Sequence, residues 1–358
     1  MDLQRVNALL EAWGEPTYRS RQAYEAATRG LAAGWDDVTV LPRSLRTRLQ
    51  AEAPLRELTA AETQESRDGT FKVRFTTADG FPLEAVAMRH RNRRTVCVSS
   101  QSGCPLACTF CATGSMGLGR NLTTGEITEQ VLVLASMLRE RGERVSNLVM
   151  MGMGEPFLNY DAVLGACRLL NDPAGFGLGA RQMAISTAGW VPGIERLAAE
   201  PMQVKLALSL HAPNDALRTE LMPVTKRYPL ARLMAACRRY RAETRRRIFV
   251  EYLMLDGVND SDALALELAE LLGADGFHVN LIAYNPTASS YRASPPDRVA
   301  QFASVLERRG VSASYRRSHG QDIDAACGQL AVRGAAELRR RRARARGSVP
   351  GAGAAARR

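Results

Sequence analysis

The chain has 358 residues, 46% of them apolar, and a net charge of +11, so it can bury a large core and suits a partner that carries phosphate groups. A membrane span needs about 20 apolar residues, and no apolar run in the sequence is nearly that long. The N-terminal segment MDLQRVNALLEAWGEP lacks the apolar core of a signal peptide. We therefore expect a cytoplasmic protein without a membrane anchor. Seven cysteines, an odd number, favour metal or thiol chemistry over a disulfide framework.

Residues 1–65 are predicted to form a small helical accessory domain, with helical stretches at 6–13, 18–30 and 41–52. Beyond them, the alternation in FKVRFTTADGFPLEAVAM around the turn ADGF indicates a β-hairpin that leads into the strand RTVCVSS. This hairpin extension opens a core domain that we expect to span residues 66–330. The basic segment 331–358 lacks apolar periodicity and is predicted to be disordered.

A strand-helix alternation follows the hairpin. The stretch TTGEITEQVLVLASMLRERG predicts a helix that begins with a capping box from Thr123 to Glu126. Near-continuous apolar runs are typical of parallel strands covered on both faces. They recur as NLVMMGMG, QMAIST, VKLALSL, RIFVEYLML, FHVNLIAY and SASYRRS. We therefore expect an α/β fold, a partial (β/α)6 barrel of the TIM type, with its site at the carboxyl ends of the strands.

The segment QSGCPLACTFC places Cys104, Cys108 and Cys111 within eight residues. A structural zinc site needs four ligands, and a thioredoxin-like redox pair would use only Cys108 and Cys111. Three thiolates at these steps suit three corners of a [4Fe-4S] cluster, whose fourth iron then takes an external ligand. S-adenosylmethionine is the known chelator of that iron, and the spacing, together with Phe110, resembles the radical SAM superfamily. The resemblance implies a [4Fe-4S] cluster and S-adenosylmethionine as cofactors.

Further motifs end the predicted strands: MGMGEP at 151–156, ISTAG at 185–189, SLH at 209–211 and YNP at 284–286. Together with VCVSSQSGC and DIDAACGQL, they resemble the RlmN/Cfr family, radical SAM enzymes that methylate an adenine carbon in large-subunit ribosomal RNA. The resemblance runs from about residue 70 to residue 330. It implies that S-adenosylmethionine is contacted by Gly154, Glu155, Ser186, Ser209, Leu210, His211 and Asn285.

The resemblance also implies catalytic roles for three further residues. Adenine C2 and C8 are not nucleophilic, so the family uses radical chemistry and two molecules of S-adenosylmethionine per turnover. Cys327 takes a methyl group from the first, and the second gives a 5′-deoxyadenosyl radical that abstracts hydrogen from that S-methyl group. The methylene radical adds to adenine, Glu84 removes the proton from the adenine carbon, and Cys97 releases the product through a transient disulfide with Cys327.

Simpler interpretations of these positions remain open from the residue pattern alone. Cys97 lies in an alternating strand and fits a core cysteine, Glu84 fits a solvent-facing strand residue, and Cys327 fits a loop thiol without a role. Cys167 and Cys237 lie inside helical patterns, and we interpret both as structural.

We therefore expect a radical SAM RNA methyltransferase that acts on an adenine carbon of 23S ribosomal RNA, with C2 preferred over C8. Ser318 and His319 stand where housekeeping members of the family usually have Thr and Arg, so another RNA such as transfer RNA is an alternative substrate. A non-catalytic, metal-containing RNA-binding protein is the alternative from a different class. We expect a monomer that binds RNA through the N-terminal helices and through RHRNRR at 89–94. The second expected partner is an external one-electron reductant.

Overall fold

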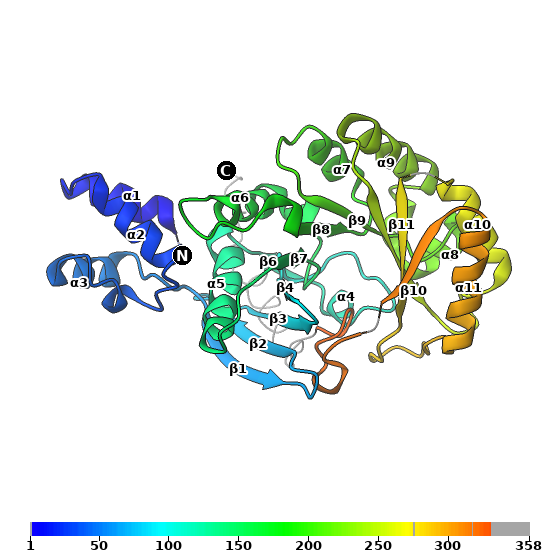
Figure 1. Ribbon diagram of the computed structural model, residues 1–358, viewed down its shortest axis with the longest axis horizontal. Coiled ribbons are helices and arrows are strands. Elements are labelled where there is room, and N and C mark those ends of the chain that lie inside the picture. Colours follow the sequence, from blue (N-terminus) through cyan, green and yellow to red (C-terminus); the bar gives the residue numbers. More distant parts are fainter. Residues whose placement is uncertain (1, 275, 317, 331–358) are drawn as a thin grey trace, which may run out of the picture.

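The computed structural model describes residues 2–274, 276–316 and 318–330, so the segment 331–358, predicted to be disordered, lies outside the described residues. Within them, ten strands form one open, curved sheet in the order β1-β2-β3-β4-β7-β8-β9-β10-β11-β12, with helices around it (Figure 1). The predicted α/β class is confirmed. Among the described residues, no helix combines the length and apolar character that crossing a membrane requires.

Three helices form the N-terminal end of the molecule, as predicted, and lie to one side of the barrel beyond α5 (Thr124–Glu140) (Figure 1). Trp35 is fully buried among them and donates its indole N–H to the Ala53 carbonyl oxygen at 2.7 Å. The three helices are α1 (Leu3–Ala12), α2 (Tyr18–Thr28) and α3 (Arg43–Glu52).

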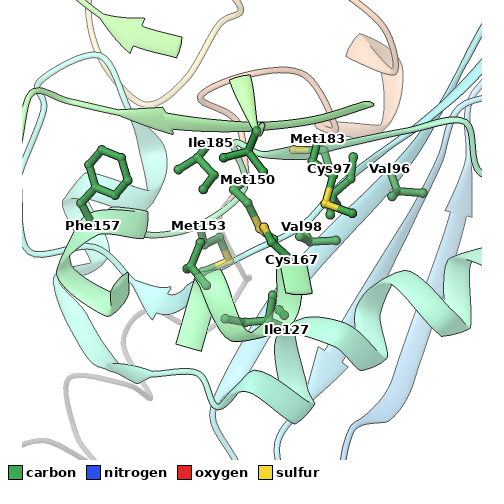
Figure 2. Packing of buried hydrophobic residues seen from close by; sticks show 14 of the residues in the cluster. Val96, Cys97, Val98, Ile127, Met150, Met153, Phe157, Cys167, Met183 and Ile185 are labelled. Atoms are coloured by element: carbon green, nitrogen blue, oxygen red, sulfur yellow. The ribbon is translucent and has the colours of Figure 1, made fainter. Parts of the chain in front are cut away.

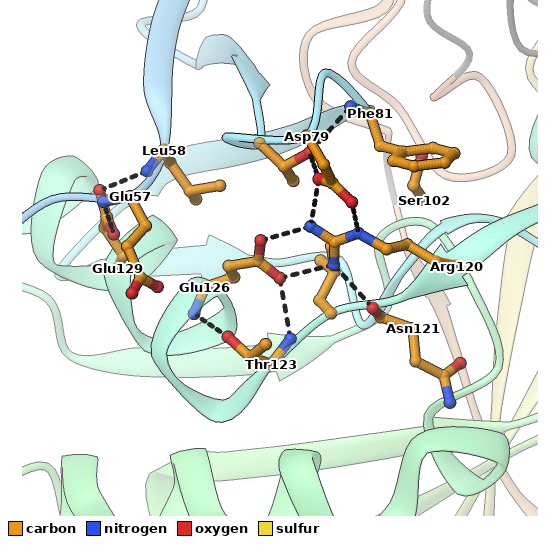
Figure 3. Close-up of polar contacts among 12 residues, drawn as sticks. Glu57, Leu58, Asp79, Phe81, Ser102, Arg120, Asn121, Thr123, Glu126 and Glu129 are labelled. Carbon is orange, nitrogen blue, oxygen red and sulfur yellow. Dashed lines mark hydrogen bonds and ion pairs between the residues drawn. The ribbon is translucent and has the colours of Figure 1, made fainter. Parts of the chain in front are cut away.

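One carboxylate fixes the linker between these helices and the sheet. Glu129 of α5 is fully buried, and its two oxygens accept the N–H groups of Glu57 and Leu58 at 2.9 and 3.0 Å (Figure 3). Charge-assisted hydrogen bonds of this kind are among the stronger ones in proteins. The linker is therefore anchored directly to the first helix of the barrel.

The first three strands of the sheet are antiparallel, and the sequence pattern indicated only two of them. β2 (Phe71–Thr76) and β3 (Pro82–His90) form the expected hairpin, and β1 (Thr59–Glu65) pairs with the outer edge of β2. β1 corrects the helical interpretation of residues 1–65 at its C-terminal end. Its side chains are exposed almost throughout and the sequence TAAETQE has no apolar alternation, so no strand signal is present there.

The parallel part of the sheet runs from β4 to β12. β4 (Arg93–Cys97) pairs antiparallel with β3 and parallel with the next strand, and each later strand is parallel to the one before it. The other strands are β7 (Asn147–Met150), β8 (Met183–Thr187), β9 (Lys205–Ser209), β10 (Ile248–Met254), β11 (Phe277–Ala283) and β12 (Ser312–Arg316). The later helices are α6 (Tyr160–Asn171), α7 (Val191–Ala198), α8 (Asp215–Leu221), α9 (Leu230–Thr244), α10 (Asp262–Leu272) and α11 (Pro296–Arg308). Six strand-helix units followed by β12 match the predicted partial barrel, and the carboxyl ends of all parallel strands face one rim.

Helix α5 begins with the capping box predicted from the sequence. The Thr123 hydroxyl accepts the Glu126 N–H at 3.1 Å, and the Glu126 carboxylate accepts the Thr123 N–H at 2.9 Å. The same carboxylate accepts from Arg120 of β6 (Leu118–Asn121), whose guanidinium also binds Asp79 of the hairpin turn, with contacts of 2.6 to 2.8 Å (Figure 3). Two carboxylates thus compensate one half-buried cation and join three segments.

Sulfur-containing side chains contribute to the core between the first parallel strands and the helices behind them. Val96, Val98 and Met150 are at most 1% exposed, and Cys167 of α6 packs into the same cluster (Figure 2). Cys237 of α9 is buried as well. The positions of these two cysteines agree with their interpretation as structural residues.

Candidate active site

A cavity of about 1560 Å³, counted out to its open mouth, lies at the carboxyl ends of the parallel strands. Parallel strands bring the residues that follow them to one rim, which is why motifs far apart in the sequence meet here. The cavity wall includes most of the residues expected from the sequence: Cys97, Cys104, Cys108, Cys111, Gly154, Glu155, Ser186, Ser209, His211 and Cys327. Glu84, Leu210 and Asn285 are not part of the wall.

The three clustered cysteines lie on the loop between β5 (Gln101–Gly103) and α4 (Ala112–Met116), and all three are partly exposed to the cavity. Backbone bonds anchor this loop on both sides. Thr109 N–H donates to the Leu221 carbonyl oxygen at 3.0 Å, and Ala112 N–H donates to the Gly328 carbonyl oxygen at 2.9 Å. The loop is therefore fixed between the end of α8 and the C-terminal segment that carries Cys327.

The donor chemistry of this loop fits an iron-sulfur cluster. Burial raises the pKa of the Cys104 thiol to about 12, and burial together with the charges of Cys111 and Cys104 raises the pKa of Cys108 well above its usual range. Thiols that resist ionisation on their own need a cationic metal centre to hold them as thiolates, and cysteine thiolates are the ligands of iron-sulfur clusters. Among the described residues, no three His, Cys, Asp or Glu side chains are grouped so as to hold a metal ion. Cys104, Cys108 and Cys111 would bind a cluster through separate iron corners.

Glu155 occupies a dry position at the end of β7. Its carboxylate accepts the N–H groups of Ala188 and Phe157 at 2.7 and 3.1 Å, and burial raises its pKa to about 7. Gly154 precedes it with a φ of +102°, and a β-carbon there would lie 2.6 Å from the Gln101 side chain. The backbone turn that presents Glu155 to the cavity therefore requires glycine. A buried carboxylate of this kind suits the ammonium group of an amino acid ligand.

The next two strand ends contribute hydroxyl groups and an imidazole. The hydroxyl oxygens of Ser186 and Ser209 lie 3.4 Å apart at the ends of β8 and β9. His211 accepts the Leu253 N–H on Nδ1 at 3.0 Å, and burial lowers its pKa to about 3, so the ring is neutral and its proton is on Nε2. The ring packs edge-on against Phe110 of the cysteine loop, with 4.8 Å between the ring centroids. These contacts connect the strand ends to the cysteine loop.

Two further thiols face the same cavity. Cys97 ends β4 and is 7% exposed, whereas Cys327 follows the turn at Gln321–Ile323 and is exposed to the cavity space. Burial raises the pKa of the Cys97 thiol, and the negative charge of Cys327 raises it further. Burial by the surrounding cavity walls also raises the pKa of Cys327. All seven cysteines of the chain are free.

The three expected residues outside the wall bind groups next to it. The Leu210 N–H donates to the Glu251 carbonyl oxygen at 3.1 Å, so its contribution is through the backbone. The Asn285 amide donates to the Cys327 carbonyl oxygen at 3.1 Å and thereby holds the segment of that thiol. Glu84 of β3 is buried and forms an ion pair with Lys72 at 3.4 Å.

Glu84 nevertheless lies on the same face of the sheet as Cys97. The β4 residue Cys97 is paired with Val86, two residues beyond Glu84 on β3, and side chains two residues apart point to the same face of a strand. Met88, another two residues on, lines the cavity. Glu84 thus lies next to the wall, on its cavity side of the sheet, and is directed toward Lys72.

The sequence pattern missed two charged residues of the wall. Glu251 of β10 and Arg316 of β12 lie 3.6 Å apart as an ion pair, and Asn280 donates to Glu251 at 2.9 Å. Burial raises the pKa of Glu251, and the Arg316 charge opposes that shift. The available signal was the single charge inside the apolar run RIFVEYLML, because an isolated charge in a buried strand usually has a specific partner.

Comparisons with known proteins agree with this geometry. A model of the Radical SAM superfamily matches residues 98–269. A relative from Chloroflexus aurantiacus, named probable dual-specificity RNA methyltransferase RlmN, is 49% identical over 345 residues, which cover 93% of this chain and 92% of the relative. A protein from Alkalilimnicola ehrlichii, named dual-specificity RNA methyltransferase RlmN, is 44% identical and covers 92% of each chain. The chain belongs to the RlmN family.

The solved structure of a radical SAM methyltransferase from Sphaerobacter thermophilus is similar throughout, with a TM-score of 0.90, 50% identity, and coverage of 92% of this chain and 97% of that chain. The radical SAM fold expected from the sequence is thereby confirmed. So are the RlmN family and the enzyme class that goes with it, a radical SAM RNA methyltransferase. Membership implies S-adenosylmethionine and an iron-sulfur cluster as the cofactors of the site.

Proposed function

We propose that this RlmN-family enzyme methylates the C2 carbon of an adenine in 23S ribosomal RNA, with C8 as the less favoured position. The observation that carries the proposal is the grouping of five thiols, because Cys97 and Cys327 line the same cavity as Cys104, Cys108 and Cys111. An adenine carbon is not nucleophilic and cannot take a methyl group by simple displacement from a sulfonium. A cavity with three cluster-binding thiols and two additional ones can hold both a radical source and a carbon carrier.

The strand-end residues are proposed to hold the cofactors. When bound at the three cysteines and the strand ends, the [4Fe-4S] cluster and S-adenosylmethionine supply the 5′-deoxyadenosyl radical that takes a hydrogen atom from an S-methyl group. The Glu155 carboxylate accepts hydrogen bonds from the ligand ammonium, and the neutral His211 ring offers Nε2–H as a donor. Gly154, Ser186, Ser209 and the Leu210 backbone complete the binding surface, and Asn285 closes it beside Cys327.

The two remaining thiols divide the work of carrying and releasing the carbon. The Cys327 thiol loses its proton and its sulfur takes the methyl group of one S-adenosylmethionine, whose S–CH3 bond breaks so that S-adenosylhomocysteine leaves. A second S-adenosylmethionine is the radical source. After the carbon has joined adenine, Glu84 accepts the proton from the adenine carbon, and the one electron that leaves the adduct would pass to the oxidised iron-sulfur cluster when it is bound. The Cys97 thiolate then attacks the Cys327 sulfur. The disulfide forms, the sulfur-carbon bond breaks, and the released carbon takes up a proton. An external reductant reopens the disulfide.

The decisive experiment traps the covalent intermediate. Without Cys97 the carbon cannot be released, so Cys97→Ala purified without oxygen should remain joined to RNA through Cys327. Cys237→Ala is the matched control, because this thiol is also buried but lies in α9, outside the cavity wall. Denaturing gel electrophoresis detects the adduct, and mass spectrometry after nuclease digestion locates it on the protein and identifies the nucleotide.

The outcomes separate the parts of the proposal. An adduct on Cys327 in Cys97→Ala, absent from Cys237→Ala and from Cys97→Ala/Cys327→Ala, supports both thiol roles. Cluster-loaded Cys97→Ala that turns over normally would remove Cys97 from the mechanism. A methyl group on an adenine nitrogen or a ribose oxygen in the wild-type product would contradict carbon methylation as a whole.

Transfer RNA is the second candidate substrate, favoured by the words "dual-specificity" in the names of both relatives. A reaction at a carbon of one base requires that base to be unstacked, which favours single-stranded loops in either RNA. Incubating the loaded enzyme separately with protein-free 23S ribosomal RNA and with transfer RNA distinguishes the cases. Methylation of transfer RNA alone would overturn the ribosomal assignment and leave the carbon chemistry intact.

RNA docking is proposed for the N-terminal helices and for the turn at 89–94. Arg89 and Arg94 of this turn already pair with Glu143, at 2.6 and 2.5 Å, so Arg91 and Arg93 are the better phosphate contacts. Phosphate contacts release counterions, so affinity should fall steeply with salt. Arg91→Gln/Arg93→Gln should weaken binding and flatten the salt dependence by about two phosphate contacts. Unchanged salt dependence would exclude this turn from the RNA interface.

A further inference from the structure

Arg218 of α8 is among the most deeply buried large side chains of the described structure, with 0% of its surface exposed. Its guanidinium donates to the carbonyl oxygens of Leu210, Ala188 and Ser209 at 3.1, 2.7 and 3.2 Å, and to the Thr225 hydroxyl at 2.8 Å. Three of these acceptors lie at the carboxyl ends of β8 and β9. Arg218 therefore joins the two strand ends that carry Ser186, Ser209 and His211.

The positive charge of Arg218 has no carboxylate partner among the described residues. All of its acceptors are neutral, and none of the ion pairs found there includes it. Asp215, on the same helix, is the carboxylate whose charge acts on Arg218, but it is exposed and its side chain accepts the Leu230 N–H at 2.7 Å. Removing a lone cation from water is strongly unfavourable unless a negative charge compensates it. The fold thus maintains a buried charge without a carboxylate in direct contact with it.

The cysteine loop lies next to this charge. The N–H of Thr109, the residue after Cys108, binds the Leu221 carbonyl oxygen at the end of α8, and Phe110 packs on His211. Burial lowers the pKa of Arg218 to about 10, and the first charge that opposes this shift is that of Cys108. The pKa remains far above neutral, so Arg218 is a cation. The thiol whose negative charge acts most strongly on Arg218 is Cys108, a member of the cluster-binding set.

We propose that Arg218 is the buried counter-charge of the thiolate-bound cluster and, through its bonds to the ends of β8 and β9, a positioning residue for the cofactor site. This inference rests on the proposed cluster at Cys104, Cys108 and Cys111. Three thiolates bring negative charge to a buried site, and one-electron reduction adds another. A fixed cation beside them stabilises the reduced form more than the oxidised form, so it makes the cluster easier to reduce.

The test is the reduction potential of the cluster, which does not depend on RNA or on turnover. Wild type, Arg218→Gln and Arg218→Lys are loaded with iron and sulfide without oxygen and titrated with a mediator series, and reduction is followed by electron paramagnetic resonance. We expect the equilibrium constant for reduction to fall at least tenfold in Arg218→Gln, which is about 59 mV toward more negative potential for a one-electron couple. Arg218→Lys keeps the charge and should remain within about threefold of wild type.

Arg56→Gln is the matched control, since Arg56 also donates to a carbonyl oxygen from a partly buried position, but that oxygen belongs to Ala32 in the N-terminal region and not to a strand end of the site. It should leave the potential unchanged. Arg218→Met, also uncharged and of similar length, must show the same shift as Arg218→Gln and replaces it if the glutamine variant does not fold. The melting temperature of each variant is recorded with and without the cluster, and the gain on loading should shrink in the uncharged variants only.

The outcomes distinguish this inference from the proposed function. Equal potentials in wild type and both uncharged variants, with melting temperatures lowered alike in loaded and unloaded protein, would reduce Arg218 to a structural cross-link and overturn the inference. Wild type that takes up no cluster would overturn the inference together with the cofactor assignment. The expected shift in an enzyme that methylates no adenine carbon would support the inference while the proposed function fails.

Discussion

Arg120 and Arg218 are two internal arginines that the fold treats in opposite ways. The Arg120 guanidinium is divided between Asp79 and Glu126, and both carboxylates come from the fold itself (Figure 3). The Arg218 guanidinium is more deeply buried and binds only neutral oxygen atoms. The charge of Arg120 is compensated by carboxylates of the folded chain, whereas we propose that the charge of Arg218 is compensated by thiolates of the cluster.

The difference separates structural charges from site charges. Arg120 with its two carboxylates joins the hairpin turn, β6 and the start of α5, whereas Arg218 binds the backbone at the two strand ends that carry site residues. A buried cation without a contacting carboxylate, next to a loop with three cysteines, instead indicates a site for an anionic, thiolate-bound cluster. Removing a charged partner from Arg120 or a thiol from the cysteine loop should therefore affect different properties, fold stability in the first case and cluster binding in the second.

The largest effect is expected when one of the cysteines near Arg218 is removed. Cys108→Ala removes one of the proposed cluster ligands, so the iron and sulfide content should fall to background and methylation should be abolished. Iron and acid-labile sulfide assays after anaerobic loading measure this directly. Cys167→Ala, which changes a buried thiol of α6 outside the cavity wall, should retain a full cluster. A Cys108→Ala protein with wild-type iron content would exclude this cysteine as a ligand.

On the compensated side, Arg120→Ala should lower stability without altering the cluster. Removing the cation leaves Glu126, whose side chain is 6% exposed, without its main partner. Because Arg120 and Asp79 are partly exposed, the expected loss is about 2 kcal/mol, less than that for a fully buried pair. Denaturant unfolding of the unloaded protein gives this value. A changed reduction potential in Arg120→Ala would erase the distinction between the two arginines.

Glu155 should make the affinity for S-adenosylmethionine depend on pH. Its pKa of about 7 lies above its ordinary value, so the empty site favours the protonated carboxyl, and that contribution to stability is lost as pH rises through 7. Binding of a cationic ammonium requires the carboxylate, so the affinity for S-adenosylmethionine should change in the opposite direction. It should fall about tenfold from pH 8 to pH 6, or about 1.4 kcal/mol. Calorimetric titration measures this loss, and Glu155→Gln should abolish the pH dependence while binding weakly throughout.

The smallest effect should come from the cap of α5. Thr123→Ala removes the hydroxyl that accepts the Glu126 N–H and should lower stability by about 1 kcal/mol. Thr123 and Arg120 both act on Glu126, so the losses in the single variants should not add in Thr123→Ala/Arg120→Ala. Strict additivity in denaturant unfolding would mean that the cap and the ion pair are independent.

Much of the fold followed from regular patterns in the sequence. The parallel strands of the barrel are apolar runs of β length, and the capping box of α5 is a local motif whose partners are three residues apart. Strand β1 was not predicted, because an edge strand with exposed side chains on both faces has no hydrophobic periodicity. Strand ends that share a rim were predictable for the same reason as the barrel, since parallel strands have only one carboxyl side.

The charged groups of the site were harder to predict. Arg218 occurs in NDALRTEL, which has the composition of an exposed helix, and only the packing of α8 against two strand ends buries it. Arg316 and Glu251 come from β12 and β10, which flank β11, so their pairing depends on the order of the strands in the folded sheet. The roles given to Glu84, Cys97 and Cys327 came from family resemblance, and these remain predictions for the experiments above.

Cys97 and Cys327 are held by different kinds of support, and this sets the mechanics of any bond between them. Cys97 belongs to a strand that is paired on both sides, whereas Cys327 lies on a loop attached through the Asn285 side chain and through the Gly328 carbonyl oxygen to Ala112. In the proposed disulfide the loop would be the part that moves, and its second attachment is next to Cys111. Closure would therefore pull on the loop of the proposed cluster ligands and would couple the redox state of the thiol pair to that segment.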